Sequence, residues 1–320
     1  MPRHTKLVEG AGAVGLVIMW SSGFIGAQLG TDTANTLTVL MWRFDLVTVG
    51  LLAWWLLFRR VRIPARQVLT QAGIGFLAQT VYLWSVFGAV ELGVSSGTTS
   101  LIDALQPLFA TALVATLLFE RVTRRQWVGL TIGFAGVAIV ISGDFQLSEG
   151  APLWIYFIPF IGMISLSIAT FLGKKARSDT NLLDCLLIQC SVSAVSFTIL
   201  AAFADQLTVP QDIDFWKAIA FGIVFSTIGG YGLYWWNLRR TSVARVGSLI
   251  YLTPPTTALW ASWWFGDPIT TTTVVGMAIC LGAVYLARED VRTPLASKKP
   301  AARQSRPDQQ SMPETEKSRT

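Results

Sequence analysis

The sequence predicts an all-α membrane protein in which ten transmembrane helices form two inverted five-helix repeats around a central cavity. Composition, charge distribution and an internal repeat predict this fold. Hydrophobic residues make up 52% of the 320 residues and charged residues only 14%, against about 25% charged residues in a typical soluble domain. A chain of this composition is expected to cross a membrane several times.

Ten segments are apolar and long enough to cross the hydrocarbon core, for which roughly 20 residues suffice. The first follows a short basic segment, as in a signal peptide, but no cleavage motif follows it, so we expect it to remain as a span. The predicted spans are 11–30, 36–58, 69–89, 94–118, 126–143, 152–173, 182–203, 215–237, 243–265 and 269–287.

The positions of the Lys and Arg residues along the chain agree with ten spans. If the N-terminus is cytoplasmic, every Lys and Arg falls in a cytoplasmic segment except Arg43, within a span, and Lys217, in an outer loop. Cytoplasmic loops of membrane proteins carry such an excess of positive residues. We therefore expect an inner-membrane protein with both termini in the cytoplasm. The net charge of +6 reflects this topology and contact with membrane lipid, and does not indicate a nucleic-acid partner.

The predicted topology divides the chain into two membrane domains with short flanking segments. The parts are a cytoplasmic N-terminal tail (1–10), the first five-helix repeat (11–143), an extracytoplasmic linker (144–151), the second five-helix repeat (152–287) and a C-terminal cytoplasmic tail (288–320). The C-terminal tail contains few large apolar residues and is expected to be disordered. All three cysteines fall within spans, which argues against a structural disulfide.

An internal repeat relates the two halves at a shift of 147 residues. FERVT at 119–123 then aligns with GDPIT at 266–270. The same shift pairs Glu120 with Asp267, Thr123 with Thr270, Pro107 with Pro254, Ser95 with Ser242, and Gly129 with Gly276. Each repeat holds five spans, and an odd number places the second copy upside down, as in many secondary transporters.

Polar side chains follow single faces of spans one, three, four, six, eight and nine. Because such side chains lack partners in lipid, we expect these faces to line a central cavity. The predicted cavity residues are Trp20, Ser21, Phe24, Gln28, Gln79, Tyr82, Thr99, Asp103, Gln106, Tyr156, Ser167, Tyr231, Tyr234 and Tyr251. The alternative is that small polar residues only hold helices together. Spans five and ten carry glycine faces and are expected at the periphery, where a homodimer contact is one alternative.

Three charged residues lie well inside spans, and two prolines occupy matched positions of the repeat. Arg43 and Asp45 point to opposite sides of one helix, and a fixed structural ion pair is the alternative to a role of Arg43 in a functional charge network. Asp103 shares its face with Thr99 and Gln106 and is the candidate coupling residue, although it could instead only bind a substrate ammonium group or hold Arg43. Pro107 and Pro254 predict paired kinks, either hinges or packing features.

Enzymatic chemistry is not favoured by the residues present. The single histidine, His4, lies in the N-terminal tail, so no Ser–His site and no histidine-based metal site is expected within the membrane. There is no phosphate-binding G-x4-G-K-[ST] motif. A membrane-embedded transferase would need a carboxylate cluster, and the inner loops offer only Glu120 and Asp179. We expect no catalytic residues, no metal and no cofactor.

Several motifs together resemble a known superfamily. They are WSSGF at 20–24, WRF at 42–44, P-x12-E/D-x2-T at 107–123 and 254–270, and the glycine-rich segments GLTIGFAGVAIV and GMAICLGAVYLA. Over residues 11–287 the chain resembles the drug/metabolite transporter superfamily in its ten-helix EamA-like branch. The resemblance implies a carrier of small metabolites, often amino acids or related compounds, and commonly an exporter.

Two departures from the family pattern leave the substrate and coupling ion open. Many relatives have a lysine near Gln28, and Asp45 and Asp103 do not belong to the family pattern. A proton-coupled exporter, an uncoupled facilitator and a lipid-linked sugar flippase are therefore alternatives, and a membrane protein that transports nothing is a fourth.

Overall fold

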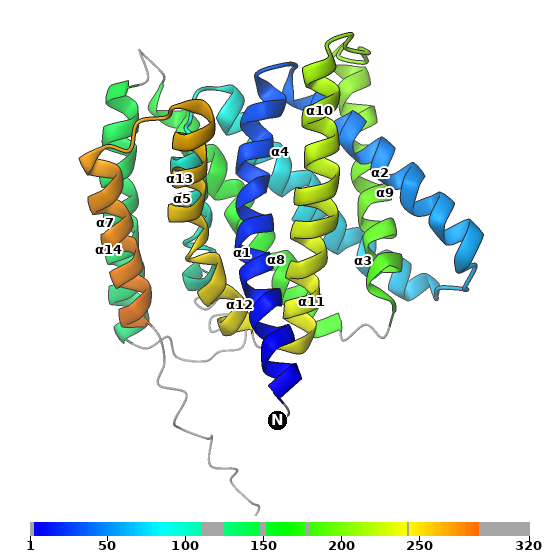
Figure 1. The fold of residues 1–320 in the computed structure, drawn as a ribbon, viewed down its shortest axis with the longest axis horizontal. Helices are drawn as coiled ribbons and strands as arrows, with labels where there is room; N and C mark the ends of the chain where they lie inside the picture. Colours follow the sequence, from blue (N-terminus) through cyan, green and yellow to red (C-terminus); the bar gives the residue numbers. More distant parts are fainter. Residues whose placement is uncertain (1–2, 110–123, 148–151, 177–179, 242, 288–320) are drawn as a thin grey trace, which may run out of the picture. The chain divides into compact units, whose positions relative to one another are not determined.

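The computed structural model describes residues 3–109, 124–147, 152–176, 180–241 and 243–287, and this part is helical with no β-strand (Figure 1). Several predicted features lie outside the described residues. They are Glu120, Thr123, Asp179, Ser242, the end of the fourth span, residues 148–151 of the linker and the tail 288–320.

The described helices of the two halves follow a similar order along the chain. The first half contains α1 (Arg3–Thr31), α2 (Thr36–Phe58), α3 (Ala65–Gly75), the π-helix η1 (Phe76–Val81), α4 (Tyr82–Glu91), α5 (Ser96–Asp103) and α7 (Arg124–Leu147). The second contains the 3₁₀ turn η2 (Leu153–Phe157), α8 (Ile158–Ala176), α9 (Leu182–Phe203), α10 (Ile213–Phe221), the π-helix η3 (Gly222–Tyr231), α11 (Gly232–Arg240), α12 (Val243–Ile250), α13 (Thr253–Phe265) and α14 (Thr271–Ala287).

Seven helical segments of the described part are long and apolar enough to cross a membrane. They are Val8–Thr31, Thr36–Phe58, Ala65–Glu91, Trp127–Phe145, Leu153–Ala176, Leu182–Phe203 and Ile213–Arg240. These segments overlap the first, second, third, fifth, sixth, seventh and eighth predicted spans. The apolar helix Thr271–Ala283, in the tenth predicted span, is shorter.

The fourth and ninth predicted spans are interrupted, where the sequence predicted continuous helices. Helix α5 ends at Asp103 and the chain becomes helical again at Gln106, while α12 ends at Ile250 and α13 begins at Thr253. Each break lies just before one of the paired prolines, which falls in the first turn of the helical segment that follows. At that position the missing backbone N–H of proline costs no intrahelical hydrogen bond. The prolines were predicted to kink these spans, and the interruption is larger than a kink.

Local sequence explains where other helices start and stop. Ser95 caps α5, since its Oγ accepts a hydrogen bond from the Thr98 backbone N–H at 3.1 Å. Asn181 and Asp212 cap α9 and α10 in the same way. Gly266 ends α13 with a positive φ of 77°, which glycine adopts without the steric cost that a side chain would add. The chain then turns sharply and places Asp267 at the end of the bundle.

Corresponding helices of the two halves pack in corresponding ways. Helix α2 contacts α9, and α7 contacts α14, while α1 packs on η3 as its counterpart α8 packs on α4 and η1. At the α7–α14 contact, a Cβ added to Gly136 would lie 2.9 Å from the Gly276 carbonyl oxygen. The glycine faces of the fifth and tenth predicted spans therefore lie against each other.

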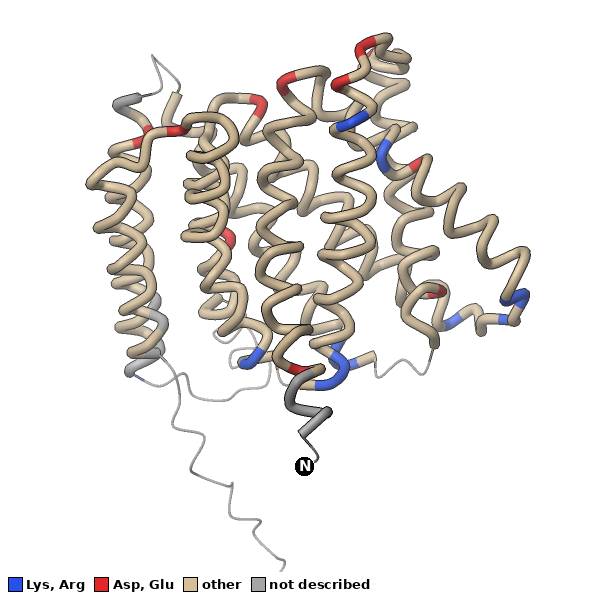
Figure 2. Tube along the Cα trace, in the orientation of Figure 1, with Lys and Arg blue, Asp and Glu red and all other residues tan. Residues whose placement is uncertain are grey.

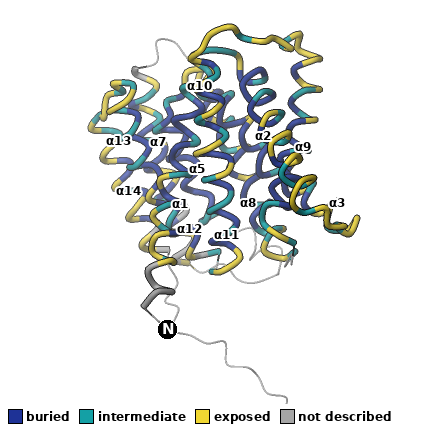
Figure 3. The backbone as a smooth tube through the Cα atoms, turned by 45° about the vertical axis from the view of Figure 1, so that its right-hand side comes forward, coloured by how far each residue is buried: buried dark blue, intermediate teal, exposed yellow. Residues whose placement is uncertain are grey.

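The surface of the bundle agrees with a membrane environment. Large apolar side chains such as Leu57, Phe203 and Trp263 are exposed on the outside of the helices, whereas buried residues face neighbouring helices (Figure 3). Lys and Arg residues concentrate at the end of the bundle where the N-terminus lies, and acidic residues gather at the opposite end (Figure 2).

Candidate functional site

A cluster of aromatic side chains surrounds Trp20 in the interior of the bundle. The Trp20 ring stacks on Tyr234 at a centroid distance of 4.7 Å and on Tyr82 at 6.0 Å, and it meets the edge of Tyr231 at 5.4 Å. These residues come from α1, α4, η3 and α11, and all four are at most 5% exposed. We call Trp20, Tyr82, Tyr231 and Tyr234 the aromatic cluster.

The carboxyl group of Asp103 contacts this cluster. Its Oδ2 accepts a hydrogen bond from Trp20 Nε1 at 3.3 Å, and the Tyr82 hydroxyl interacts with the same carboxyl group. Asp103 is 2% exposed and forms no ion pair with a Lys or Arg of the described residues. A buried ionised group is costly unless it is paired or hydrated, so such carboxyl groups within membranes are usually functional.

Three residues further along the chain from Asp103, Gln106 begins a second set of hydrogen bonds, which joins the fourth predicted span to the sixth and the eighth. Gln106 Nε2 donates to Thr170 Oγ1 at 3.1 Å and to the Tyr234 hydroxyl at 3.3 Å. Ser167, one turn from Thr170 on α8, lies within 3.5 Å of the Gln106 carbonyl oxygen. The sequence analysis missed Thr170, although it lies on the same face of α8 as Ser167.

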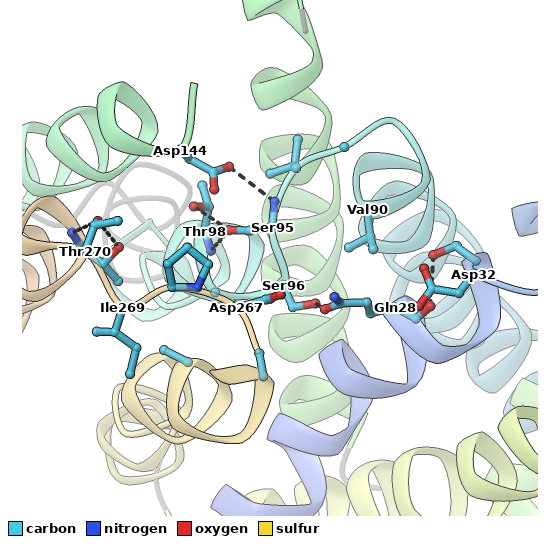
Figure 4. Close-up of a pocket in the computed structure, with 18 residues that line it drawn as sticks. Gln28, Asp32, Val90, Ser95, Ser96, Thr98, Asp144, Asp267, Ile269 and Thr270 are labelled. Atoms are coloured by element: carbon cyan, nitrogen blue, oxygen red, sulfur yellow. Dashed lines mark hydrogen bonds between the residues drawn. The ribbon is translucent and has the colours of Figure 1, made fainter. Parts of the chain in front are cut away.

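A cavity of about 490 Å³ is lined by the C-terminal end of α1, the N-terminal end of α5 and the segment after α13 (Figure 4). This end of α1 is the one away from the N-terminus (Figure 1). Its wall carries three carboxylates, Asp32 after α1, Asp144 near the end of α7, and Asp267 after α13. In the sequence Asp267 stood out through the internal repeat and the P-x12-E/D-x2-T pattern, whereas Asp32 and Asp144 were not predicted as site residues. All three follow or end helices on one side of the predicted membrane, which was the available signal. We call this space the outer cavity.

Hydrogen bonds fix the base of the outer cavity. Ser96 Oγ donates to Gln28 Oε1 at 2.6 Å, and the Gln28 side chain also bonds Asp267. The Ser95 backbone N–H donates to Asp144 Oδ2 at 3.2 Å (Figure 4). Partial burial raises the pKa of Asp267, and the nearby carboxylates of Asp144 and Asp32 act in the same direction. The three carboxylates make the wall of the outer cavity acidic.

Helices α1 and α5 connect the outer cavity to the aromatic cluster. The Gln28–Ser96 hydrogen bond joins them at the cavity, and the Trp20–Asp103 hydrogen bond joins them again in the interior. With a rise of 1.5 Å per residue, the two bonds are separated by roughly 10–12 Å along the helices. The side chains of Ser21, Phe24 and Thr99 lie between these levels and are buried.

Three predicted cavity residues lie apart from the aromatic cluster. Gln79 turns towards α9, where its Nε2 donates to Gln189 Oε1 at 3.4 Å. Tyr156 packs in a small separate group that includes Val94. Tyr251, at the break between α12 and α13, packs with residues of α5, α7 and α14.

The two intramembrane prolines are placed beside the helix breaks. A Cβ added to Gly247 of α12 would lie 2.6 Å from Pro107 Cβ, so Pro107 packs directly on that helix. Pro254 lines a space of about 10 Å³ together with Tyr251 and Cys280.

Arg43 and Asp45 do not form an ion pair with each other. Asp45 is partly exposed and accepts hydrogen bonds from Thr198 Oγ1 at 3.2 Å. Arg43 is buried and donates to Ser226 and Thr227 on η3. Within the described residues, therefore, the fixed ion pair considered as an alternative for Arg43 is not formed, and no group of three or more His, Cys, Asp or Glu is placed to hold a metal ion.

Comparison with known proteins identifies the family. The model of the EamA-like transporter family matches residues 10–142 and again 153–288. The chain is 27% identical over 286 residues to the uncharacterized inner membrane transporter YedA of Escherichia coli strain K12, covering 89% of this chain and 92% of the relative. A solved crystal structure with 18% identity superposes with a TM-score of 0.65 over 88% of this chain and 96% of that one, which supports the fold.

Two further relatives carry functional names. The chain is 21% identical to the probable amino-acid metabolite efflux pump of Salmonella typhimurium strain LT2, over 87% of this chain and 94% of the relative. It is 24% identical to the probable terminal-alkyne amino-acid exporter of Streptantibioticus cattleyicolor, over 84% and 90%. These names indicate a transporter rather than an enzyme. With its apolar helices and its two family matches, this chain is a membrane-spanning transporter that belongs to the EamA-like transporter family.

Proposed function

We propose that this transporter is a secondary carrier that exports small amine-bearing metabolites, amino acids or related compounds, by alternating access. The observation that carries the proposal is the Asp103 carboxyl group, buried at the aromatic cluster, with an acidic outer cavity at the other end of α5. A carboxylate that lacks a basic partner in the described residues is suited to receive a cationic group from a substrate.

The chemistry of both sites favours an amine. Aromatic faces attract cations, a carboxylate forms charge-assisted hydrogen bonds with an ammonium group, and the acidic wall of the outer cavity raises the local concentration of cations. The functional names of the two relatives, both concerning amino acids, agree with this substrate class. Trp20, Tyr82, Tyr231, Tyr234, Gln106 and Asp103 form the central site of this proposal.

An inverted repeat supports alternating access. A shift of 147 residues brings η1 onto η3 and the break after Asp103 onto the break after Ile250. Corresponding helices also make corresponding contacts. Ten spans in two repeats of five, with both termini cytoplasmic, account for these relations and for the charge distribution of the loops. The two halves would rock about the central site, with Pro107 and Pro254 as flexible points.

Reconstitution of the purified full-length chain into proteoliposomes tests the function. Vesicles loaded with an unlabelled mixture of proteinogenic amino acids should take up a labelled member of that mixture by exchange, well above protein-free vesicles. Exchange no faster than in protein-free vesicles, for every amino acid in the mixture, would contradict the proposed function.

The same vesicles test the flexible points. Pro107→Ala should slow exchange more than it weakens binding, because alanine restores a backbone donor and favours a continuous helix at the break. Pro64→Ala, in the exposed connection between α2 and α3, is the control and should leave the exchange rate unchanged. If Pro107→Ala also leaves it unchanged, the break is a packing feature and not a hinge.

A further inference from the structure

A second buried charge approaches the aromatic cluster from another helix. Arg43, on α2, is 1% exposed and forms no ion pair with a carboxylate of the described residues. Its Nε donates to Thr227 Oγ1 at 2.9 Å and its Nη2 to Ser226 Oγ at 2.7 Å. Its Nη1 has no hydrogen-bonding partner in the same part of the chain. A guanidinium group carries five N–H donors, so capacity for a further acceptor remains.

The surroundings of Arg43 hold the guanidinium group without neutralising its charge. The Cζ atom lies 5.6 Å from the Phe44 ring centroid and 5.7 Å from that of Phe87, and both rings attract a cation weakly. A Cβ added to Gly222 would lie 3.2 Å from Arg43 Cδ, so a glycine leaves room for the side chain. Within the described residues this buried cation contacts hydroxyl groups, aromatic faces and the Cys190 side chain, and no carboxylate, so it is suited to receive an anionic group.

Ser226 links Arg43 to the site that contains Asp103. It accepts the hydrogen bond from Arg43 and lines a small space of about 10 Å³ together with Trp20, Tyr82 and Tyr231. Trp20 in turn donates to Asp103. The buried cation and the buried carboxyl group therefore border the same aromatic cluster, and they do not pair with each other.

We propose that Arg43, assisted by Ser226 and Thr227, binds the carboxylate of the transported solute while Asp103 binds its ammonium group. The planar guanidinium fork matches a carboxylate in two parallel hydrogen bonds. This inference rests on the proposed carrier function and narrows its substrate class to zwitterions that bear both an amine and a carboxylate. The present arrangement is closed around this space, so binding requires the rings and the Ser226 hydroxyl to move aside.

Binding of matched compounds to the purified full-length chain tests the inference. The proteinogenic amino acids are first compared for affinity, and the tightest is then compared with its decarboxylated amine. In the parent protein the amino acid should bind more tightly than the amine. Arg43→Gln should weaken amino-acid binding about 10- to 100-fold, as expected for the loss of a hydrogen-bonded charge pair, and change amine binding less than about twofold.

Two further variants provide a charge control and an independent test of the same carboxylate site. Lys217→Gln removes an equal charge from the exposed first part of α10, where the ammonium group pairs with Asp214, and should change neither affinity. Ser226→Ala keeps the Arg43 charge and should weaken amino-acid binding about fivefold with little effect on the amine. This second variant carries the test where Arg43→Gln does not fold.

Three outcomes of these binding measurements would contradict the inference, and one of them would also contradict the proposed function. Equal weakening of amine and amino acid by Arg43→Gln, in protein with an unchanged melting temperature, would overturn the inference and assign Arg43 a structural role. A parent protein that binds the amine as tightly as the amino acid would also overturn it, while leaving an amine carrier intact. A parent protein that binds neither would contradict the proposed function and this inference together.

Discussion

Replacing Asp103 by asparagine should abolish transport driven by a pH gradient, whereas substrate exchange should persist with weaker binding, because the amide oxygen still accepts a hydrogen bond from an ammonium group. In proteoliposomes, we expect gradient-driven transport by Asp103→Asn to fall at least about tenfold, to the level of protein-free vesicles. Asparagine keeps the size of the side chain and an oxygen that can accept the hydrogen bond from Trp20 Nε1. It cannot bind or release a proton, so the exchange of proton for ammonium at this position is lost.

Asp45→Asn is the matched comparison for this experiment. Asp45 also lies within a predicted span, but it is partly exposed on α2 and bonds Thr198 instead of the aromatic cluster. Its replacement should leave gradient-driven transport within about twofold of the parent. If Asp103→Asn matches the parent as well, the carrier is uncoupled or another group couples it. If Asp103→Asn loses exchange too, Asp103 is needed for binding itself.

Gly75→Ala should destabilise the protein markedly, because the backbone of α9 leaves no room for a methyl group at this position. A Cβ added to Gly75 would lie 2.5 Å from the Gln189 Cα atom, and a backbone atom cannot move aside without shifting a helix. We expect a loss of about 1–3 kcal/mol in the free energy of unfolding and a clear fall in melting temperature. Gly75 directly precedes the π-helix η1, so the strain also reaches the segment that leads to Tyr82.

Gly73→Ala, two residues away on α3, is the control for this effect. A Cβ added to Gly73 meets nothing within 4 Å. Alanine is favoured over glycine in a helix by up to about 1 kcal/mol, so this variant should melt at the same temperature as the parent or slightly higher. Thermal unfolding of both variants and the parent in the same detergent compares their melting temperatures. Equal melting temperatures would contradict the close α3–α9 contact.

Hydropathy and charge allowed most helices to be predicted, because lipid requires a long run of apolar residues from each span. The predicted segments 36–58 and 182–203 coincide with α2 and α9 to within a residue. The prolines marked the positions of the two helix breaks. Their extent was missed, since no local pattern says whether a chain kinks or stops at an intramembrane proline.

The candidate site was harder to predict, because its contacts join residues far apart in the chain. The Trp20–Asp103 hydrogen bond spans 83 positions. The polar faces identified Trp20, Tyr82, Tyr231 and Tyr234 together, yet the same rule also selected Gln79 and Tyr156, which turn to other neighbours. Periodicity indicates that a side chain faces away from lipid, but it does not indicate which helix that side chain contacts. The hydroxyl partners of Arg43 lie beyond the reach of periodicity for the same reason.

The accessibility of a cysteine at position 99 tests alternating access to the central site most directly. Thr99 is fully buried on α5, one turn from Asp103 on the side of the outer cavity. In a chain whose native cysteines are replaced, Ile269→Cys and Arg245→Cys serve as references for the two ends of the bundle. The exposed Ile269 lines the outer cavity, and Arg245 bonds Glu9 near the N-terminus.

With a membrane-impermeant thiol reagent, Ile269→Cys should react only from outside and Arg245→Cys only from inside. Thr99→Cys should react from both sides, in right-side-out and in inverted vesicles, and bound substrate should slow both reactions. Reaction of Thr99→Cys from one side alone, under conditions in which the protein exchanges substrate, would contradict alternating access around this site.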